Sequence, residues 1–380
     1  MKLKHKKDMI FFITASLAML AMIWFGLNNS IDFGINLTEA TYPRGRVVEI
    51  ISDQTEVDAD GVRRGRQDLL VEILTGENRG RIVEVQNILF IDAAVYAQVG
   101  TRLVLFFDQQ EGDTGYFARV HTYERATAIY VIIILFVGLL TAVSGKAGLR
   151  SAFGLIFTFV TLLFLLIPSI ANGAPPALLT LGLSLCIIAV SLIAIMGFER
   201  KTHISIAGAA IGIVLCCFFY LIISLALRIT GFNVPEMSIL VNVGFQANAR
   251  IAELLFSGII IASLGAVMDT SVSVASATAE IAQADQKAEF MALFRRSMSV
   301  ARDCIGTSVN TLVLAFTGTF FVTLVLFQLN NFDYHMIIHR TDIAIEVLRA
   351  MTASAALVLC APATALISAR MYCAKQSKKK

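Results

Sequence analysis

The feature that most constrains the fold is a series of long apolar runs. Eight stretches are dominated by hydrophobic side chains and separated by short polar segments: residues 9–27, 126–143, 149–170, 176–198, 204–227, 252–268, 308–329 and 350–367. Several reach the ~20 residues that a helix needs to cross a bilayer. Only 16% of the 380 residues are charged, below the ~25% typical of soluble domains. The runs therefore predict a membrane all-α bundle of about eight transmembrane helices.

Residues 28–125 have a different pattern. Polar and apolar side chains alternate in five short stretches, at residues 46–51, 69–74, 81–85, 102–107 and 116–120, with Gly and Asp between them. Such alternation is typical of strands that bury one face. We expect a small extracytoplasmic β-barrel, OB-like in type, inserted after the first helix.

The predicted domains follow from these two patterns. Residues 1–27 form an N-terminal transmembrane helix, 28–125 the β-rich domain, 126–371 a seven-helix bundle and 372–380 a basic cytoplasmic tail. Within the bundle, residues 284–302 are amphipathic, with Phe290, Leu293, Phe294 and Met298 on one side and basic residues elsewhere. This pattern predicts a helix lying on the cytoplasmic membrane surface; a solvated connector is the alternative.

Lysine and arginine are unevenly distributed between the runs. The segments on the side of both termini carry seventeen, whereas the short loops on the other side carry three. The positive-inside rule therefore places both termini in the cytoplasm and residues 28–125 on the other side of the cell membrane. Residues 28–125 contain ten Arg and sixteen acidic residues, so this domain would repel phosphate and no nucleic acid is expected as a partner.

One apolar run leads into a polar stripe. Asp269, Ser273, Ser276 and Glu280 follow one another at steps of four, three and four, which keep to one face of a helix. The two carboxylates would lie ~16 Å apart along the axis, too far to share a proton but suited to stations on a transport path. Gly265 permits a helix break at this point, and one long helix is the alternative. Asp269 could also snorkel to the membrane interface.

The next run opens with a similar pattern. Asp303, Thr307 and Asn310 share one helix face, and Arg302 precedes them. We expect the two stripes to face each other at the inner ends of the sixth and seventh helices and to form the path of the substrate or ion. Arg302 or Arg296 would neutralise a carboxylate there or bind an anionic cargo. Hydrogen bonding that only joins the helices is the alternative.

Two charge pairs begin the sixth and eighth runs. Arg250 and Glu253 are three residues apart, as are Glu346 and Arg349. These four residues are candidates for an outer gate of crossed ion pairs. Anchoring of the helices at the interface is the alternative.

Several classes of function find no support in the sequence. The six cysteines show no C-x-x-C pair and the five histidines are scattered, so we predict no disulfide framework and no metal site. P-loop and dinucleotide-binding glycine patterns do not occur, so we predict no cofactor. An intramembrane aspartyl protease would need two carboxylates that share a proton, and its Gly-x-Gly-Asp setting is missing. We therefore do not expect an enzyme.

The block at residues 265–280 resembles the signature stretch of the YibE/F family of bacterial membrane proteins. The order of the parts is also similar: one span, a short β-rich segment and a seven-span bundle. Glu346 and Arg349, with the later Pro362, resemble the last span of that family. Thr270 and Val272 depart from the small or apolar residues expected there, and this leaves the stripe intact. The resemblance implies a multispanning transporter of poorly defined substrate and no enzymatic activity.

The leading functional hypothesis is a secondary transporter in the lipid bilayer, with a small ion or metabolite as cargo. Export of a small anion such as phosphate would suit the inner arginines. The alternative is a non-transporting membrane scaffold or sensor that acts through the β-domain. The sequence does not set the oligomeric state, and a homo-oligomer remains open.

Overall fold

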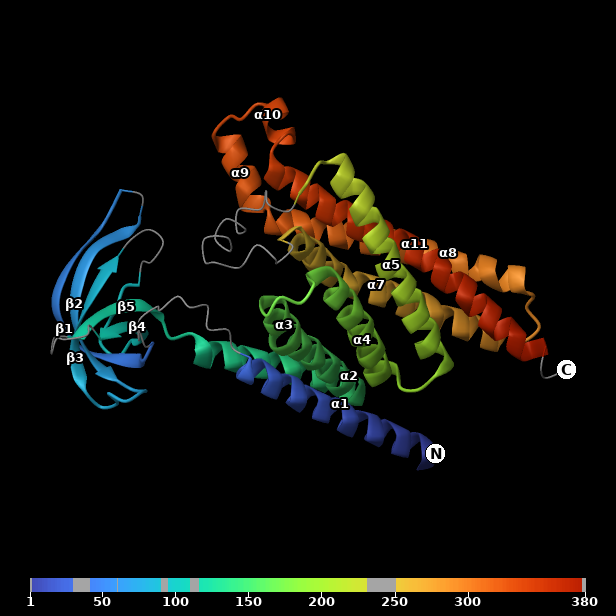
Figure 1. The fold of residues 1–380 in the computed structure, drawn as a ribbon, viewed down its shortest axis with the longest axis horizontal. Helices are drawn as coiled ribbons and strands as arrows, with labels where there is room; N and C mark the ends of the chain where they lie inside the picture. The colour runs from blue at the N-terminus through green and yellow to red at the C-terminus, as the bar shows by residue number, and fades with distance from the viewer. Residues whose placement is uncertain are drawn as a thin grey trace. The chain divides into compact units, whose positions relative to one another are not determined.

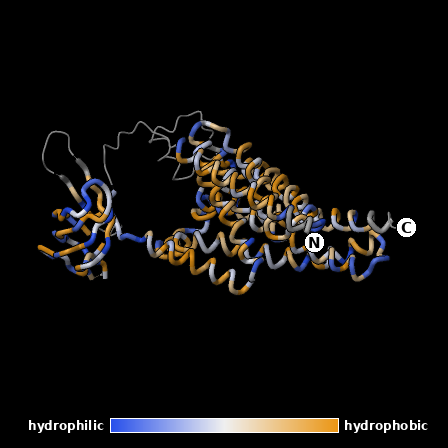
Figure 2. The backbone as a smooth tube through the Cα atoms, turned by 90° about the horizontal axis from the view of Figure 1, so that it is seen from below, coloured by the Kyte–Doolittle hydropathy of each residue, from blue (hydrophilic) through white to orange (hydrophobic). Residues whose placement is uncertain are grey.

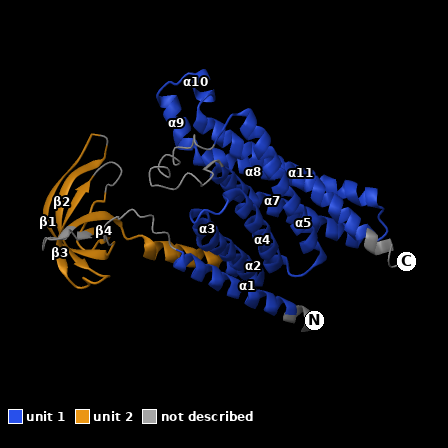
Figure 3. Cartoon of the chain, in the orientation of Figure 1, with its two compact units in different colours: residues 1–31, 140–380 blue, residues 32–139 orange. Residues whose placement is uncertain are grey.

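The computed structural model describes residues 2–29, 42–59, 61–89, 95–109, 116–230 and 251–377. The chain divides into two compact units, Met1–Ile31 with Leu140–Lys380, and Asp32–Leu139 (Figure 3). Each unit has its own hydrophobic core and is described separately.

The second unit contains a closed five-stranded barrel. Its strands are β1 (Arg44–Val57), β2 (Arg63–Ile73), β3 (Ile82–Leu89), β4 (Arg102–Gln109) and β5 (Tyr116–Tyr123), arranged in the order β1-β2-β3-β5-β4. Neighbouring strands are antiparallel, except that β3 and β5 are parallel. The five predicted strands and the barrel are confirmed, and most of the strands are longer than the alternating patterns that predicted them.

Two buried amides close one side of the barrel interior. The side chains of Gln67 and Asn87 are almost inaccessible to solvent, and an Asn87 Nδ2 donor lies 3.0 Å from Gln67 Oε1. Gln67 Nε2 donates to Asp53 Oδ2 at 3.1 Å and to the Ala97 carbonyl at 3.2 Å, and Asn87 Nδ2 donates to the Val95 carbonyl at 2.6 Å. Buried amides must find such partners, so this network holds residues 95–97 against the barrel wall.

The first unit is a bundle of helices (Figure 1). Its elements are α1 (Lys2–Asn28), the later part of α2 (Ala126–Val160), the π-helix η2 (Thr161–Leu166), α3 (Ile167–Ala171), α4 (Pro176–Met196), α5 (Arg200–Ala226), α7 (Ile251–Ala284), α8 (Phe290–Thr319), α9 (Phe321–Leu329), α10 (Tyr334–Ile338) and α11 (Thr341–Ser377). Hydrophobic residues predominate along these helices (Figure 2). Many apolar side chains, such as Leu225 and Val143, are exposed, as expected for helices whose neighbours include lipid.

The number of candidate spans differs from the predicted eight. Within the described residues, six helices are long and apolar enough to cross a membrane, or up to seven if α8 and α9, bent by 57°, form one span. The difference arises at residues 144–148, where we predicted a polar turn between two spans. Residues 126–171 count there as one stretch of 46 residues, although two helices meet within it at Gly145, whose backbone is not helical.

The chain does turn within the predicted segment, through a sharp reversal of its direction at a single residue. Gly145 has φ 56° and ψ −133°, a conformation open to glycine because it lacks a Cβ. A Cβ on Gly148 would overlap the Leu140 carbonyl and lie 3.1 Å from the Thr141 Cα. In a straight helix, residues 140 and 148 would be ~12 Å apart. The backbone therefore folds back on itself around Gly145.

The amphipathic segment at residues 284–302 is not a separate surface helix. α8 begins at Phe290 and continues without interruption to Thr319. Its apolar residue Leu293 is buried in a cluster with Ala282 and Ala369, and Phe294 packs beside them. Leu293 and Phe294 of the predicted apolar face are thus covered by α7 and α11, whereas Phe290 is exposed.

Candidate functional site

The candidate site is centred on α7, which runs unbroken from Ile251 to Ala284. No break occurs at Gly265, so the structure matches the alternative of one long helix. Its 34 residues span ~51 Å, well beyond the ~30 Å of a hydrocarbon core. α7 is therefore longer than one crossing of a hydrocarbon core requires.

α7 has a packed face and an open face. Ser263, Val267, Ser271 and Val274 are fully or almost fully buried. The predicted stripe lies on the opposite side, where Asp269, Ser273 and Glu280 are exposed and Ser276 is half-buried. The same face continues through Gly258, Ala262 and Gly265, which are also exposed. The stripe is thus a real helix face, and it points away from the core of this chain.

The depth of Asp269 follows from contacts to neighbouring helices. Ser205 Oγ on α5 donates to the Ser271 carbonyl at 3.4 Å, and Ser205 lies five residues, or ~7.5 Å, from the start of α5 at Arg200. Asp269 lies a further ~3 Å from that level along α7. At the other end, Glu253 contacts the start of α4 through the Ala177 amide, ~24 Å from Asp269 along α7. Asp269 is therefore ~10 Å inside the bundle, too deep for its short side chain to reach the Arg200 level.

The second stripe lies on the open face of α8. Asp303, Thr307 and Asn310 are exposed, as is Arg302, whereas Ala301 on the opposite side is fully buried. The Thr307 hydroxyl donates to the Asp303 and Cys304 carbonyls of its own helix at 3.2 and 3.1 Å. The spacing rule thus identified a shared face on α8 as well.

α7 and α8 contact each other through residues that lie outside the two stripes. Thr278 Oγ1 on α7 donates to Ser297 Oγ on α8 at 3.0 Å, and Val274 packs beside Ala301. Over the described lengths of α7 and α8, no hydrogen bond or ion pair joins one stripe to the other. The facing arrangement that we expected is therefore not seen as a direct contact.

The stripes nevertheless share a depth. Measured from the Thr278–Ser297 contact, Asp269 lies nine residues, or ~13.5 Å, along α7. Asp303 lies six residues, or ~9 Å, along α8 in the same direction. The two carboxylates are therefore within ~5 Å of the same level.

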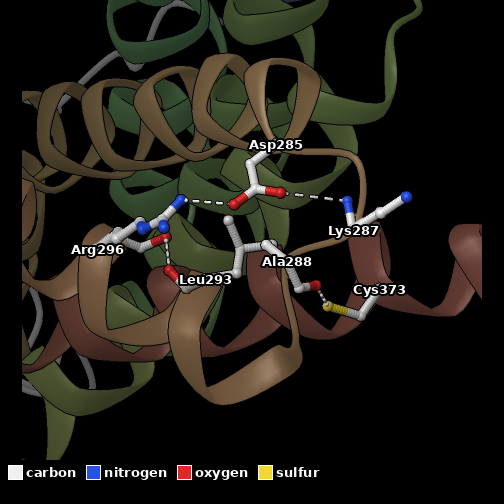
Figure 4. Close-up of polar contacts among 7 residues, drawn as sticks. Asp285, Lys287, Ala288, Leu293, Arg296 and Cys373 are labelled. Atoms are coloured by element: carbon white, nitrogen blue, oxygen red, sulfur yellow. Dashed lines mark hydrogen bonds and ion pairs between the residues drawn. The ribbon is translucent and has the colours of Figure 1, made fainter.

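The basic residues near the stripes have different partners from those expected. Arg296 pairs with Asp285 in the α7–α8 connection, with 3.0 Å between Nη1 and Oδ2 (Figure 4). The Lys287 amide donates to the other Asp285 oxygen at 3.3 Å, and the Cys373 thiol on α11 donates to the Ala288 carbonyl at 3.7 Å. This group fixes the connection between α7 and α8 beside the end of α11. Arg296 is thus committed to Asp285, whereas Arg302 forms no ion pair within the described residues.

Two of the four residues of the predicted outer gate have contacts of a different kind. Arg250 lies outside the described residues. Glu253 accepts a hydrogen bond from the Ala177 amide at 3.1 Å, at the positive end of the α4 dipole. Glu346 pairs with Arg349 at 2.8 Å within α11. Both carboxylates therefore serve local contacts at helix starts, and the crossed pairing stays a prediction.

The closest packing in the bundle was not predicted. α5 carries Gly208 and Gly212, four residues apart, where it meets α7 and α11. A Cβ on Gly208 would overlap the Thr364 side chain, and one on Gly212 would overlap Val267 and lie 3.1 Å from the Cys360 Cβ. Small residues at this spacing let membrane helices approach closely. The Gly-x-x-x-Gly pattern at residues 208–212 was the signal in the sequence that could have found this contact.

Small polar side chains line the same packed interior. The Cys360 thiol lies 3.4 Å from the Gly208 carbonyl, and the Cys216 thiol lies 3.4 Å from the Ser263 hydroxyl. Thr270 and Ser368 are buried with hydroxyl oxygens that have no hydrogen-bond partner within the described residues. Most of these contacts join helices, which is the structural role of such residues in membrane bundles.

These features define the class of the protein as a multi-helix bundle with several helices long and apolar enough to cross a membrane. The sequence profile of the YibE/F-like protein family matches residues 132–374. The match covers more than half of the chain, so the chain belongs to this family, and the predicted resemblance is confirmed. The barrel lies before the matched region. No curated protein and no solved structure matches the chain.

Proposed function

We propose that this chain is a secondary transporter of a small ion or metabolite in a bacterial cell membrane, with both termini in the cytoplasm and the barrel outside. Its path runs along the open faces of α7 and α8, past two groups of polar residues. These are Asp269, Ser273, Ser276 and Glu280 on α7, and Arg302, Asp303, Thr307 and Asn310 on α8.

The observation that carries this proposal is the position of Asp269. Its carboxylate lies ~10 Å inside the bundle, on a helix face that the rest of this chain leaves open. A carboxylate facing lipid at the centre of a span costs ~2.5–3.5 kcal/mol on insertion scales. Such groups are found where a polar cavity or a water-filled path receives them. Asp303 lies at nearly the same depth on the open face of α8, and we infer that it borders the same path.

The chemistry of the two stripes suits coupling to a proton or cation. A carboxylate that alternates between charged and neutral forms can carry a proton between two accessible states. Arg302, which has no ion-pair partner in the described part of the chain, suits an anionic cargo because guanidinium binds phosphate and carboxylate through two hydrogen bonds. Export of a small anion such as phosphate is the form of transport that we infer.

The test is flux through purified protein in proteoliposomes. A panel of labelled anions, cations and metabolites would be measured with and without a proton gradient, for the wild type and for Asp269→Asn. Asp285→Asn is the matched control, because Asp285 pairs with Arg296 in the connection outside the spans. We expect one solute to move, Asp269→Asn to reduce its flux by about tenfold or more, and Asp285→Asn to leave it within about twofold.

A second candidate function is favoured by the barrel. It is a compact unit with its own core. From its five closed strands we infer an OB-like domain, a type that binds ligands on its surface. A sensor or scaffold of this kind would keep all its activity in Asp269→Asn. Absence of flux for every solute in the panel, with intact protein, would favour this function.

A further inference from the structure

The barrel domain has a local group of arginines on three of its strands. Residues 28–125 carry an excess of acidic side chains, yet five of the ten arginines belong to the start of β1, to β4, to β5 and to the short link after β5: Arg44, Arg46, Arg102, Arg119 and Arg125. On the distal part of β1 and on β2 the charges are mixed, and ion pairs join Arg64 to Asp58 and Arg66 to Asp68. The net acidic charge of the domain therefore does not describe the local charge around β4.

The strand register places these arginines on one outer face. Arg46 is the partner of Arg102, Arg44 is the partner of Val104, and Phe106 is the partner of Arg119. Leu103, Leu105 and Phe107 are buried in the barrel, so the alternating residues 102, 104 and 106 of β4 point outward. Arg44, Arg46 and Arg119 are exposed.

Aromatic rings lie among the arginines. Tyr42 is 54% exposed, and its ring centroid lies 5.7 Å from that of Phe106 and 5.2 Å from that of His121. The guanidinium carbon of Arg119 lies 4.5 Å from the Phe106 ring centroid. Stacking of this kind fixes a guanidinium and leaves its N–H donors available at the edges.

Most of this positive charge is unneutralised. Arg46 pairs with Glu72 at 2.7 Å. Arg44, Arg102 and Arg119 form no ion pair within the described residues. A cluster of exposed, uncompensated guanidinium groups with aromatic rings favours an anionic partner that also offers apolar surface.

Chain continuity identifies the surface that this face meets. β5 ends at Tyr123 and α2 begins at Ala126, in the same compact unit as the barrel. Glu124 donates its amide to the Arg102 carbonyl at 3.0 Å, which ties β4 to this junction. Ile129 and Ile132 are already 50% and 65% exposed, as for a helix entering lipid. The arginines of β5 and of the link after it are therefore only a few residues from the point at which α2 enters the membrane.

We propose that this basic face, formed by Tyr42, Arg44, Arg102, Phe106, Arg119 and His121, binds the anionic phospholipid headgroups of the bilayer that α2 enters. Arginine binds phosphate through paired hydrogen bonds, and tyrosine is enriched at the level of the lipid headgroups. The binding holds the barrel against the bilayer. It rests on the membrane character of the helices and is independent of the transport proposal.

The test uses the full-length protein in nanodiscs of phosphatidylcholine alone or mixed with phosphatidylglycerol. The photoreactive residue p-benzoylphenylalanine replaces Thr122, which is the β5 partner of Val104, and lipid adducts are measured by mass spectrometry. The control site is Ile88, which is 49% exposed on β3. We expect adducts at position 122 to be about fivefold or more abundant with phosphatidylglycerol, and position 88 to give few in either lipid.

Charge variants separate headgroup binding from simple tethering. Arg102→Gln with Arg119→Gln should remove the preference for phosphatidylglycerol, whereas Arg102→Lys with Arg119→Lys should retain most of it. Arg64→Gln with Arg66→Gln, on β2, should leave it unchanged, and melting curves would show that each variant folds. Equal adducts in both lipids, unchanged adducts in the Gln variant, or adducts only to a second copy of the chain would each overturn the proposal.

Discussion

The substitution Gly208→Ala tests the account of how the bundle is held together. Gly208 lies where α5 meets α11, and the added Cβ would overlap Thr364 Oγ1 and lie about 3.0 Å from the Thr364 Cβ. Thr364 is fully buried, so its side chain has no open space to enter. The two helices must move apart or the threonine must leave its rotamer.

The size of the effect follows from the packing. Inserting one carbon into a filled interior typically costs ~1–3 kcal/mol, which is a factor of roughly 5 to 150 in the folded-to-unfolded ratio. The higher helix propensity of alanine offsets at most ~1 kcal/mol of this cost. Gly212→Ala should behave similarly, because its Cβ would overlap Val267 and crowd Cys360.

The assay is thermal unfolding in detergent micelles. Unfolding is monitored by the reaction of a thiol dye with Cys216 and Cys360, which are buried in the folded protein. Gly182→Ala is the control, since a Cβ on that glycine of α4 has nothing within 4 Å. The double variant Gly208→Ala with Thr364→Ala should recover much of the lost stability, because Thr364 donates within its own helix, to the Cys360 carbonyl. An unchanged melting temperature in Gly208→Ala, or an equal loss in Gly182→Ala, would refute the reasoning.

Two further predictions concern the barrel and the reversal in α2. Hydrogen bonds from the Thr55 side chain, and then from Gln67, the Thr55 amide and Tyr96, lower the pKa of Asp53 below its usual 3.8, against a smaller opposing effect of desolvation. The resulting stabilisation is therefore present above about pH 4 and is lost as the pH falls through the lowered value. Hydrogen exchange of residues 95–97 should rise in that acid range, and Asp53→Asn should already show the faster exchange at pH 7. Gly145→Ala should cost ~1–3 kcal/mol because φ 56° with ψ −133° strains any residue with a Cβ; a melting temperature equal to that of Gly138→Ala would show that the reversal is not strained.

Much of the architecture could be predicted because two periodicities are strong in this chain. The alternation around Leu69 and Val71 identified strands whose inward residues are indeed buried. The steps of three and four from Asp269 to Glu280 identified a real helix face. Periodicity depends only on neighbours along the chain, so it survives without knowledge of the tertiary structure.

The environment of each face could not be predicted in the same way. Spacing shows that Asp269 and Ser273 share a side of α7, but it does not show which helices cover the other sides. The reversal at Gly145 was expected as a polar loop, because the local sequence cannot distinguish a five-residue turn from one glycine with positive φ. The amphipathic residues of α8 were assigned to lipid for a similar reason: the apolar residue Leu293 is covered by parts of α7 and α11 that are distant in sequence.

The central claim is that Asp269 belongs to the path of a transported solute. The most direct measurement is the initial rate of gradient-driven flux in proteoliposomes, compared between Asp269→Asn and Asp285→Asn at equal protein incorporation. The account predicts that Asp269→Asn loses nearly all of the flux and that Asp285→Asn keeps it. Equal rates in the two variants and the wild type would contradict the account, because a carboxylate on the path could not be replaced without consequence.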